Sequence, residues 1–183
     1  GSEMCIRDSY YISDLADLFI SSVIAIFGSL FIVFFYILLR FQKWQFSIGA
    51  VSAVFHDVLV VLGIFSLTYK IMPFNMEINQ AFIAALLTVI GYSLNDTVIV
   101  FDRIRENLKK YQSVELLEVL NKSINETLSR TIITSLTTLL ALLALFIFGG
   151  EVIRGFTFAM IWGVLIGTYS SIFIASSILP VSY

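Results

Sequence analysis

An aspartate lies inside an apolar stretch that is long enough to cross a membrane. Asp96 belongs to residues 88–106, a segment that begins apolar and ends charged. A carboxylate deep in a spanning helix costs about 2.5–3.5 kcal/mol on insertion scales, so it normally has a partner, a proton or a function. Its neighbours Ser93, Asn95 and Thr97 add polar groups that we predict to support it.

A basic residue, Arg130, is the second candidate for chemistry within the membrane. It lies near the start of the next apolar segment, which runs antiparallel to the Asp96 segment. Both groups then fall in the same half of the membrane, and one interpretation is a proton-coupling pair. The alternative is that Arg130 extends to the lipid headgroups, as long cations near helix ends commonly do. Asp96 has a shorter side chain and reaches less far.

Threonine hydroxyls follow Arg130 at helical spacing. Thr134, Thr137 and Thr138 share its predicted helix face. One interpretation is a hydrated polar seam that passes protons. The other is ordinary packing, in which each hydroxyl bonds a carbonyl one turn back or a neighbouring helix. The packing interpretation covers most such threonines, but it does not explain an aspartate and an arginine at the same depth.

A second acidic residue, Asp57, follows His56 near the middle of another apolar segment. One of the two could join the Asp96 site, or the pair could satisfy itself and a neighbouring polar group. In the last apolar segment, Gly163 and Gly167 form a GxxxG motif, which permits close approach between helices. We interpret that motif as structural.

The composition requires a membrane environment. Hydrophobic residues make up 58% of the chain and charged residues 13%, with a mean hydropathy of +0.94. A soluble domain carries roughly a quarter charged residues. The single cysteine excludes an internal disulfide and a thiolate metal cluster, and no phosphate-binding glycine loop is present. We therefore expect no metal, no cofactor, no nucleic-acid partner and no enzymatic activity.

Apolar segments near the length of about 20 residues that a bilayer requires dominate the chain. They cover residues 17–40, 46–69, 80–101, 128–148 and 155–179. The pattern predicts an all-α fold, a polytopic membrane bundle of five spans over residues 17–183. Residues 1–16 are predicted to lie outside this domain, as a non-native or remnant segment.

The connectors between spans predict the orientation. Seven Lys and Arg residues lie within or beside the first and third connectors, against two in the others. Because Lys and Arg accumulate in cytoplasmic loops, we expect a cytoplasmic C-terminus. Residues 102–127 also repeat apolar positions at helical spacing, which predicts two short amphipathic helices with a break near residues 112–113. They either contact a cytosolic partner or, as we prefer, rest on the lipid interface.

Several motifs resemble the SecF family of protein-export membrane subunits, within the resistance-nodulation-division superfamily. They include FHDVLVVLG, GYSLNDTVIVFDRIREN, LSRTIITSLTT and RGFTFAMIWGVLIGTYSSIF, and their order and spacing are preserved from about residue 18 to 180. The resemblance implies that Asp96 and Arg130 form the proton-coupling pair. It further implies that proton flow helps to draw secreted proteins through the Sec channel of the bacterial inner membrane.

The resemblance also implies the partners of the chain. These are a SecD-like subunit, the SecYEG channel, YajC and YidC, unfolded secretory polypeptide, protons and membrane lipids. The family places a further helix and a folded outer domain ahead of the first span, so we expect the printed chain to be part of a longer protein. Two rivals stay open: half of a proton-coupled efflux transporter of the same superfamily, and a structural membrane scaffold.

Overall fold

The described part of the chain is entirely helical. The computed structural model describes the backbone of residues 2–74 and 76–181 and the side chains of residues 16–74 and 76–178. These residues form α1 (Ser2–Phe41), α2 (Trp44–Thr68), α3 (Gln80–Lys110), α4 (Leu116–Phe148) and α5 (Glu151–Val181). All five helices are long and apolar enough to cross a membrane. The predicted all-α membrane bundle is therefore confirmed.

The first helix extends further towards the N-terminus than the predicted first span. α1 begins at Ser2, whereas that span is predicted to begin at residue 17. The helix thus runs through residues that we placed outside the membrane domain. The division of the chain at residue 17 stays a prediction.

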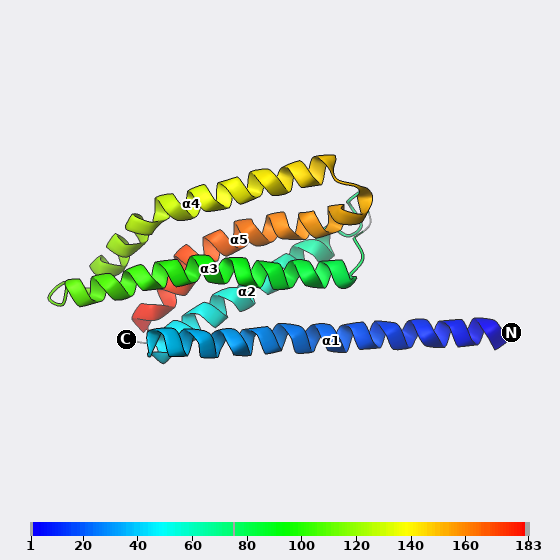
Figure 1. Ribbon diagram of the computed structural model, residues 1–183, viewed down its shortest axis with the longest axis horizontal. Coiled ribbons are helices and arrows are strands. Elements are labelled where there is room, and N and C mark those ends of the chain that lie inside the picture. The colour runs from blue at the N-terminus through cyan, green and yellow to red at the C-terminus, as the bar shows by residue number, and fades with distance from the viewer. Residues whose placement is uncertain (1, 75, 182–183) are drawn as a thin grey trace.

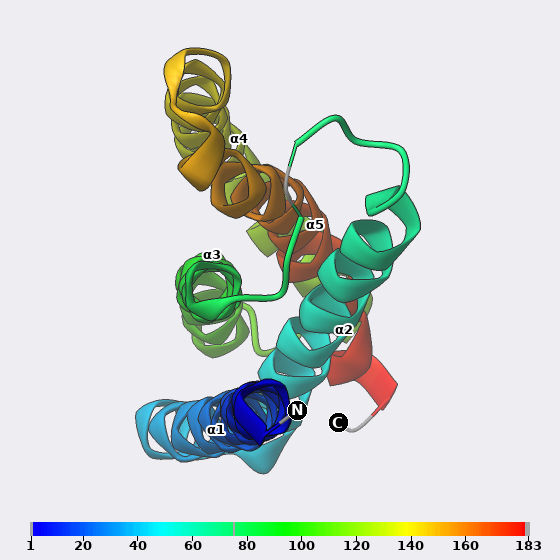
Figure 2. The ribbon, with the colours of Figure 1, turned by 90° about the vertical axis from the view of Figure 1, so that its right-hand side faces the viewer.

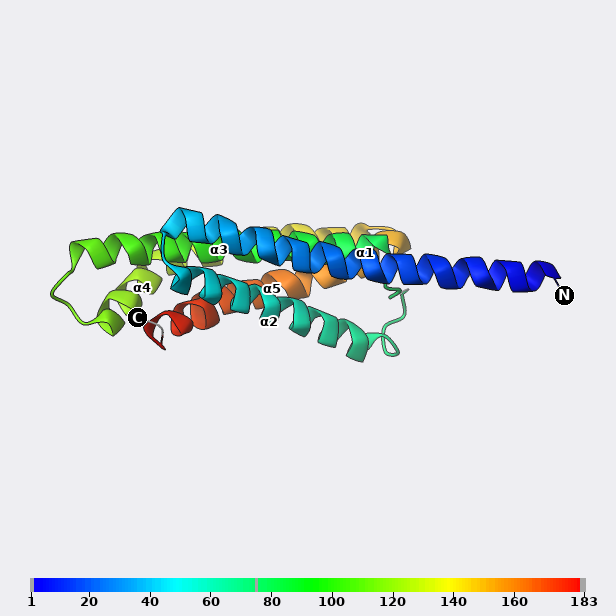
Figure 3. The ribbon, with the colours of Figure 1, turned by 90° about the horizontal axis from the view of Figure 1, so that it is seen from below.

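Helix α5 lies at the centre of the bundle. It packs against α2, α3 and α4, as the view along the bundle shows (Figure 2). Helix α1 packs on α2 and to a lesser extent on α3, and its N-terminal half projects beyond the other helices (Figures 1 and 3). Many of its large apolar side chains are exposed, among them Phe19, Phe31 and Leu39. Such a face suits contact with lipid or with another membrane helix.

The GxxxG motif brings α5 into close contact with α3. A Cβ atom at Gly163 would lie 2.0 Å from Cγ2 of Val89, and one at Gly167 would lie 3.1 Å from Cβ of Ser93. No larger side chain fits between the helices at Gly163 without displacing Val89. The motif therefore has the packing role that we assigned to it.

The predicted connector helices are continuations of α3 and α4. α3 runs to Lys110 and α4 starts at Leu116, so the two amphipathic helices are not separate elements. The break covers residues 111–115, which includes the predicted position, and the residue that precedes α4 is Glu115. This turn, the α1–α2 turn and the C-terminus all lie at one end of the bundle (Figure 1).

We predict that Gly163→Ala lowers the stability of the bundle. The new methyl group must push α3 from α5 or force Val89 into another rotamer, and overpacking of this kind costs about 1–3 kcal/mol. Unfolding of the purified chain in detergent, followed by circular dichroism, measures the effect. Gly91→Ala is the matched control, because a Cβ atom at Gly91 meets nothing within 4 Å. Equal stability of the two variants would contradict the packing role.

Candidate functional site

The Asp57 carboxylate joins three helices in the middle of the bundle. Asp57 of α2 is 0% exposed, and its Oδ2 accepts hydrogen bonds from Oγ of Ser93 on α3 at 2.5 Å and from Oγ of Ser170 on α5 at 2.7 Å. Nδ1 of the half-buried His56 lies 3.3 Å from Oδ1 of the same carboxylate. Asp57 on α2 thus has hydrogen-bond partners on both α3 and α5.

These hydrogen bonds stabilise the Asp57 carboxylate in an apolar interior. A buried polar group without a hydrogen bond is strongly destabilising, more so when it is charged. The serine hydroxyls supply two donors, and Gly167 gives Ser93 the room to approach α5. The His56–Asp57 pair thus contacts itself and neighbouring hydroxyls, as one of the two interpretations expected, and a role of Asp57 in the Asp96 site stays a prediction.

Asp96 lies on α3, one turn after Ser93, and its environment differs from that of Asp57. It is 2% exposed, and its Oδ2 has no hydrogen-bond partner among the described residues. The buried hydroxyls of Thr97 on α3 and Thr131 on α4 are without partners in the same sense. The Ser47 hydroxyl on α2 is a further example. Since buried polar groups are normally paired, the unpaired oxygen of the Asp96 carboxylate makes it the candidate for binding a proton.

Arg130 approaches Asp96 without forming an ion pair. Its charge interacts electrostatically with the Asp96 carboxylate, but among the described residues the two make no direct salt bridge. Arg130 is exposed and lines a cavity of about 490 Å³ between the charged ends of α3 and α4. The cavity is lined by Ile99, Asp102, Arg103, Arg105, Glu106, Lys109, Glu126, Thr127 and Arg130. It connects the level of Arg130 with the charged end of the bundle.

The threonines that follow Arg130 bond their own helix. Thr134 donates to the carbonyl of Arg130 at 3.0 Å, Thr137 to that of Ile133 at 3.0 Å and Thr138 to that of Thr134 at 2.9 Å. The packing interpretation therefore describes their hydroxyls in this structure. Thr134 and Thr137 are exposed, as is Asn95 on α3, so these predicted supporting residues do not join the buried groups.

The inward polar face of α4 carries different residues. Oγ of Ser135 lies 2.6 Å from Oγ1 of Thr168 on α5, and the Tyr92 hydroxyl on α3 donates to Ser135 at 3.4 Å. Sequence reasoning placed Ser135 beside the Arg130 face of its helix, but it missed Tyr92, Thr168 and Ser170. The available signal was the hydroxyl-rich GTYSS segment that begins at Gly167, but its pattern does not say which hydroxyl faces a carboxylate.

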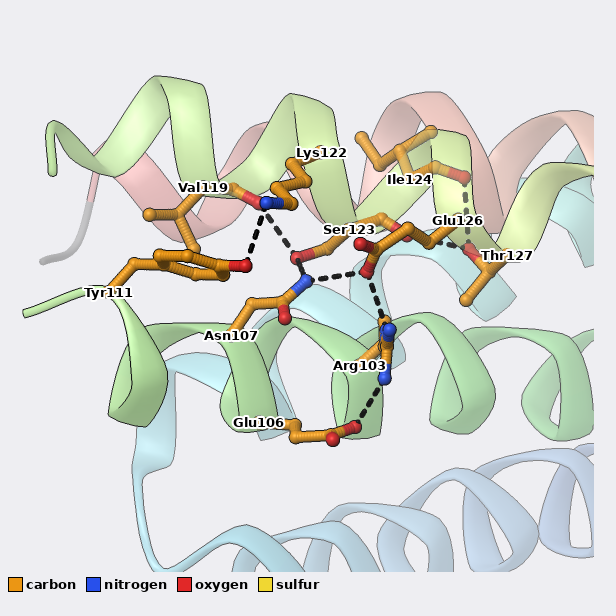
Figure 4. A network of polar contacts seen from close by, with 10 residues as sticks. All are labelled: Arg103, Glu106, Asn107, Tyr111, Val119, Lys122, Ser123, Ile124, Glu126 and Thr127. Carbon is orange, nitrogen blue, oxygen red and sulfur yellow. Dashed lines mark hydrogen bonds and ion pairs between the residues drawn. The ribbon is translucent and has the colours of Figure 1, made fainter.

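A network of charged and polar side chains connects α3 and α4 beyond the apolar spans (Figure 4). Nε of Arg103 donates to Glu126 at 2.6 Å, and Nδ2 of the buried Asn107 donates to Ser123 at 3.0 Å and to Glu126 at 2.8 Å. Arg103 and Glu126 also line the cavity that contains Arg130. The two helix ends are therefore joined directly beside the candidate site.

A further contact ties the turn to α4. Nζ of Lys122 donates to the Tyr111 hydroxyl at 2.7 Å and lies 4.1 Å from the centre of its ring. This hydrogen bond holds the pKa of Tyr111 below its usual value. These contacts between the two helix ends indicate a rigid element. That its surface rests on lipid stays a prediction.

Among the described residues, no group of three or more His, Cys, Asp or Glu residues could hold a metal ion.

The fold and site define a polytopic membrane protein with two acidic residues buried between its spans. Comparison with known proteins identifies its class. The model of the family described as "Protein export membrane protein SecD/SecF, C-terminal" matches residues 13–182. The chain therefore belongs to the SecD/SecF C-terminal family.

Individual relatives agree with this assignment. The protein translocase subunit SecF of Rhodothermus marinus is 60% identical over 162 residues, which are 88% of this chain and 52% of that protein. The same subunit of Thermodesulfovibrio yellowstonii is 60% identical over 148 residues, 80% of this chain and 47% of that protein. A crystal structure of SecDF in its super-membrane-facing form superposes with a TM-score of 0.78 at 45% identity, covering 86% of this chain and 20% of that one. The chain spans about half the length of these SecF relatives.

We predict that Ser170→Ala destabilises the bundle by about 1–3 kcal/mol, because it leaves a lone pair of the buried Asp57 carboxylate without its donor. The same substitution should cost much less in an Asp57→Ala background, where no side-chain acceptor is left for the Ser170 hydroxyl. Unfolding of the purified variants in detergent gives both values. Ser171→Ala is the control, since the Ser171 hydroxyl donates to the carbonyl of Thr168 within its own helix. Additive effects of the Asp57 and Ser170 substitutions would contradict the direct contact.

Proposed function

We propose that the chain is part of a proton-driven membrane machine that helps to translocate secreted proteins through the Sec channel. Its relatives are protein translocase subunits, and the solved structure that it resembles is that of SecDF. The observation that carries the proposal is Asp96: a carboxylate buried in a spanning helix, with a nearby arginine and with an oxygen that has no hydrogen-bond partner in the described part of the chain. No covalent catalytic step is needed for this role.

In the proposed mechanism, a proton changes the interaction between α3 and α4. Burial disfavours the charged form of Asp96, while the positive charge of Arg130 favours it. Because the two effects oppose each other, a small displacement of Arg130 switches Asp96 between its ionised and protonated forms. Protonation ends the attraction between the two residues and releases α4 from α3 at this level.

The membrane potential supplies the direction. A proton that crosses the full membrane gains about 2.3 kcal/mol per 100 mV. We propose that Asp96 takes its proton from the outer side and returns it to the cytosol through the 490 Å³ cavity beside Arg130. Since Arg103, Asn107 and Glu126 join the ends of α3 and α4, movement at Asp96 would be passed to the cytosolic turn.

The proposed partner is a SecD-like subunit, packed against the outer face of α4. That face exposes Ile132, Ile133, Leu136 and Leu140. A second bundle, related to the first by an axis along the membrane normal, would cover this face and shield the exposed Arg130 from lipid. The SecYEG channel, YajC, YidC and the unfolded secretory polypeptide belong to the same proposal, as partners of the whole assembly.

The proposed location is the bacterial inner membrane, with the C-terminus in the cytoplasm. We predict that a cysteine at Gln112, in the α3–α4 turn, is labelled only from the cytoplasmic side and one at Glu77, before α3, only from outside. The basis is the concentration of Lys and Arg at the end of the bundle that holds the α3–α4 turn. A membrane-impermeant maleimide applied to spheroplasts, in a Cys5→Ser background, gives the measurement. Labelling of residue 112 in intact spheroplasts would overturn the orientation.

We predict that Asp96→Asn abolishes proton-driven export while leaving assembly intact. An amide keeps the shape of the side chain but can no longer bind and release a proton. Export of a secretory protein into membrane vesicles, with and without an imposed proton gradient, measures the effect in the full-length complex. Glu118→Gln is the control, because Glu118 is exposed at the start of α4 and does not line the cavity that contains Arg130. If the Asp96→Asn variant still responded to the proton gradient, Asp96 would not be the coupling residue. A gradient response equal to that of the unmodified protein would also favour a structural scaffold role for this chain.

A further inference from the structure

A second cavity lies where α1 turns into α2. Its volume is about 380 Å³, and it is lined by Phe41, Gln42, Lys43, Phe46, Arg105, Leu108, Lys109 and Gln112. The apolar stretch of α1 ends at Phe41 and that of α2 begins at Trp44. The cavity is therefore at the level where the spans leave the hydrocarbon and lipid headgroups begin. It is separate from the cavity that contains Arg130, although Arg105 and Lys109 border both.

The charge of this cavity is positive. Lys43, Arg105 and Lys109 line it, and none of the described residues that line it is acidic. The acidic side chains closest along α3 are engaged elsewhere: Asp102 pairs with Arg40 at 2.9 Å, and Glu106 pairs with Arg103 at 2.6 Å. Arg105 and Lys109 therefore present positive charge to the cavity, which suits an anion.

Arg105 is held in position by the α1–α2 turn. Its Nη1 donates to the carbonyl of Arg40 at 3.3 Å, and its guanidinium lies 6.0 Å from the centre of the Phe41 ring. A guanidinium carries five N–H groups, so this one bond leaves enough donors for two parallel hydrogen bonds to a phosphate. The stacked rings of Phe41 and Phe46, 5.1 Å apart, form an apolar floor beside it.

The turn itself is built around a strained residue. Gln42 has a φ of 56°, a left-handed conformation that a non-glycine residue rarely adopts. Its N–H caps α1 by donating to the carbonyl of Leu38 at 2.8 Å, and its side chain lines the cavity. Strain of this kind is found at ligand-binding positions more often than elsewhere. It gives an observation independent of the charges.

We propose that this cavity binds the phosphate headgroup of an anionic phospholipid. Arg105 and Lys109 hold the phosphate, and the lipid tail lies along the exposed apolar side chains beside the turn, which include Leu39 and Trp44. A free phosphate ion would meet the same cations but would gain nothing from that apolar surface. Basic pockets between spanning helices at the membrane surface bind such headgroups in other membrane proteins. The proposal does not depend on proton coupling.

Native mass spectrometry of the full chain in detergent tests the proposal with phosphatidylglycerol and phosphatidylcholine as probes. Phosphatidylglycerol should bind the chain more tightly, and Lys109→Gln should weaken that binding about fivefold, the effect of one cation near a membrane surface. Arg105→Gln combined with Lys109→Gln should remove the preference. Lys110→Gln is the matched control: Lys110 is exposed on the same turn but does not line the cavity.

Several results would overturn the proposal. Equal binding of both lipids would do so, as would an equal effect of Lys109→Gln and Lys110→Gln. Displacement of phosphatidylglycerol by millimolar inorganic phosphate would replace the lipid with a free anion as the ligand. Lys109 is exposed and makes no ion pair among the described residues, so Lys109→Gln should fold normally and decides the question even if the Arg105 variant does not fold. Circular dichroism checks the folding of each variant.

Discussion

The contact of two serine hydroxyls with one buried carboxylate is the interaction on which the packing of α2, α3 and α5 depends. Asp57 tolerates the apolar interior because Ser93 and Ser170 donate to it, and Ser93 reaches α5 because Gly167 has no side chain. Packing and hydrogen bonding thus require one another here. In a bilayer no water replaces a lost donor, so this interaction also specifies how the three helices align along their axes.

The two buried aspartates differ in how fully they are satisfied. Asp57 has donors from α3 and α5, whereas among the described residues Asp96 has an oxygen without a hydrogen-bond partner and forms no salt bridge with the nearby Arg130. A satisfied carboxylate is suited to hold helices in one arrangement. An unsatisfied carboxylate beside an exposed cation is suited to change state. This physical difference is the reason for proposing proton coupling at Asp96 rather than at Asp57.

The end of the bundle that holds most of the cations carries both the proposed proton exit and the proposed lipid site. Arg103, Asn107 and Glu126 join the ends of α3 and α4 on one side, and Arg105 donates to the carbonyl of Arg40 at the α1–α2 turn on the other. One helix thereby borders both the proposed proton exit and the proposed lipid site. Arg105 and Lys109 of α3 line both cavities, so the same short stretch of this helix borders the two proposed sites.

The sequence by itself determined the five spans, the helical character of the long connector and the presence of ionisable groups in the membrane, because length, apolar periodicity and the cost of a buried charge are local properties. It also showed that Gly163 permits close packing. Only the tertiary structure decided that Asp57 meets Ser170, a residue 113 positions away, and that Ser135 rather than Thr134 faces the interior. Helical spacing groups residues on a face, but the rotation of each helix, and so the identity of the inward face, is set by contacts between helices that are distant in the chain.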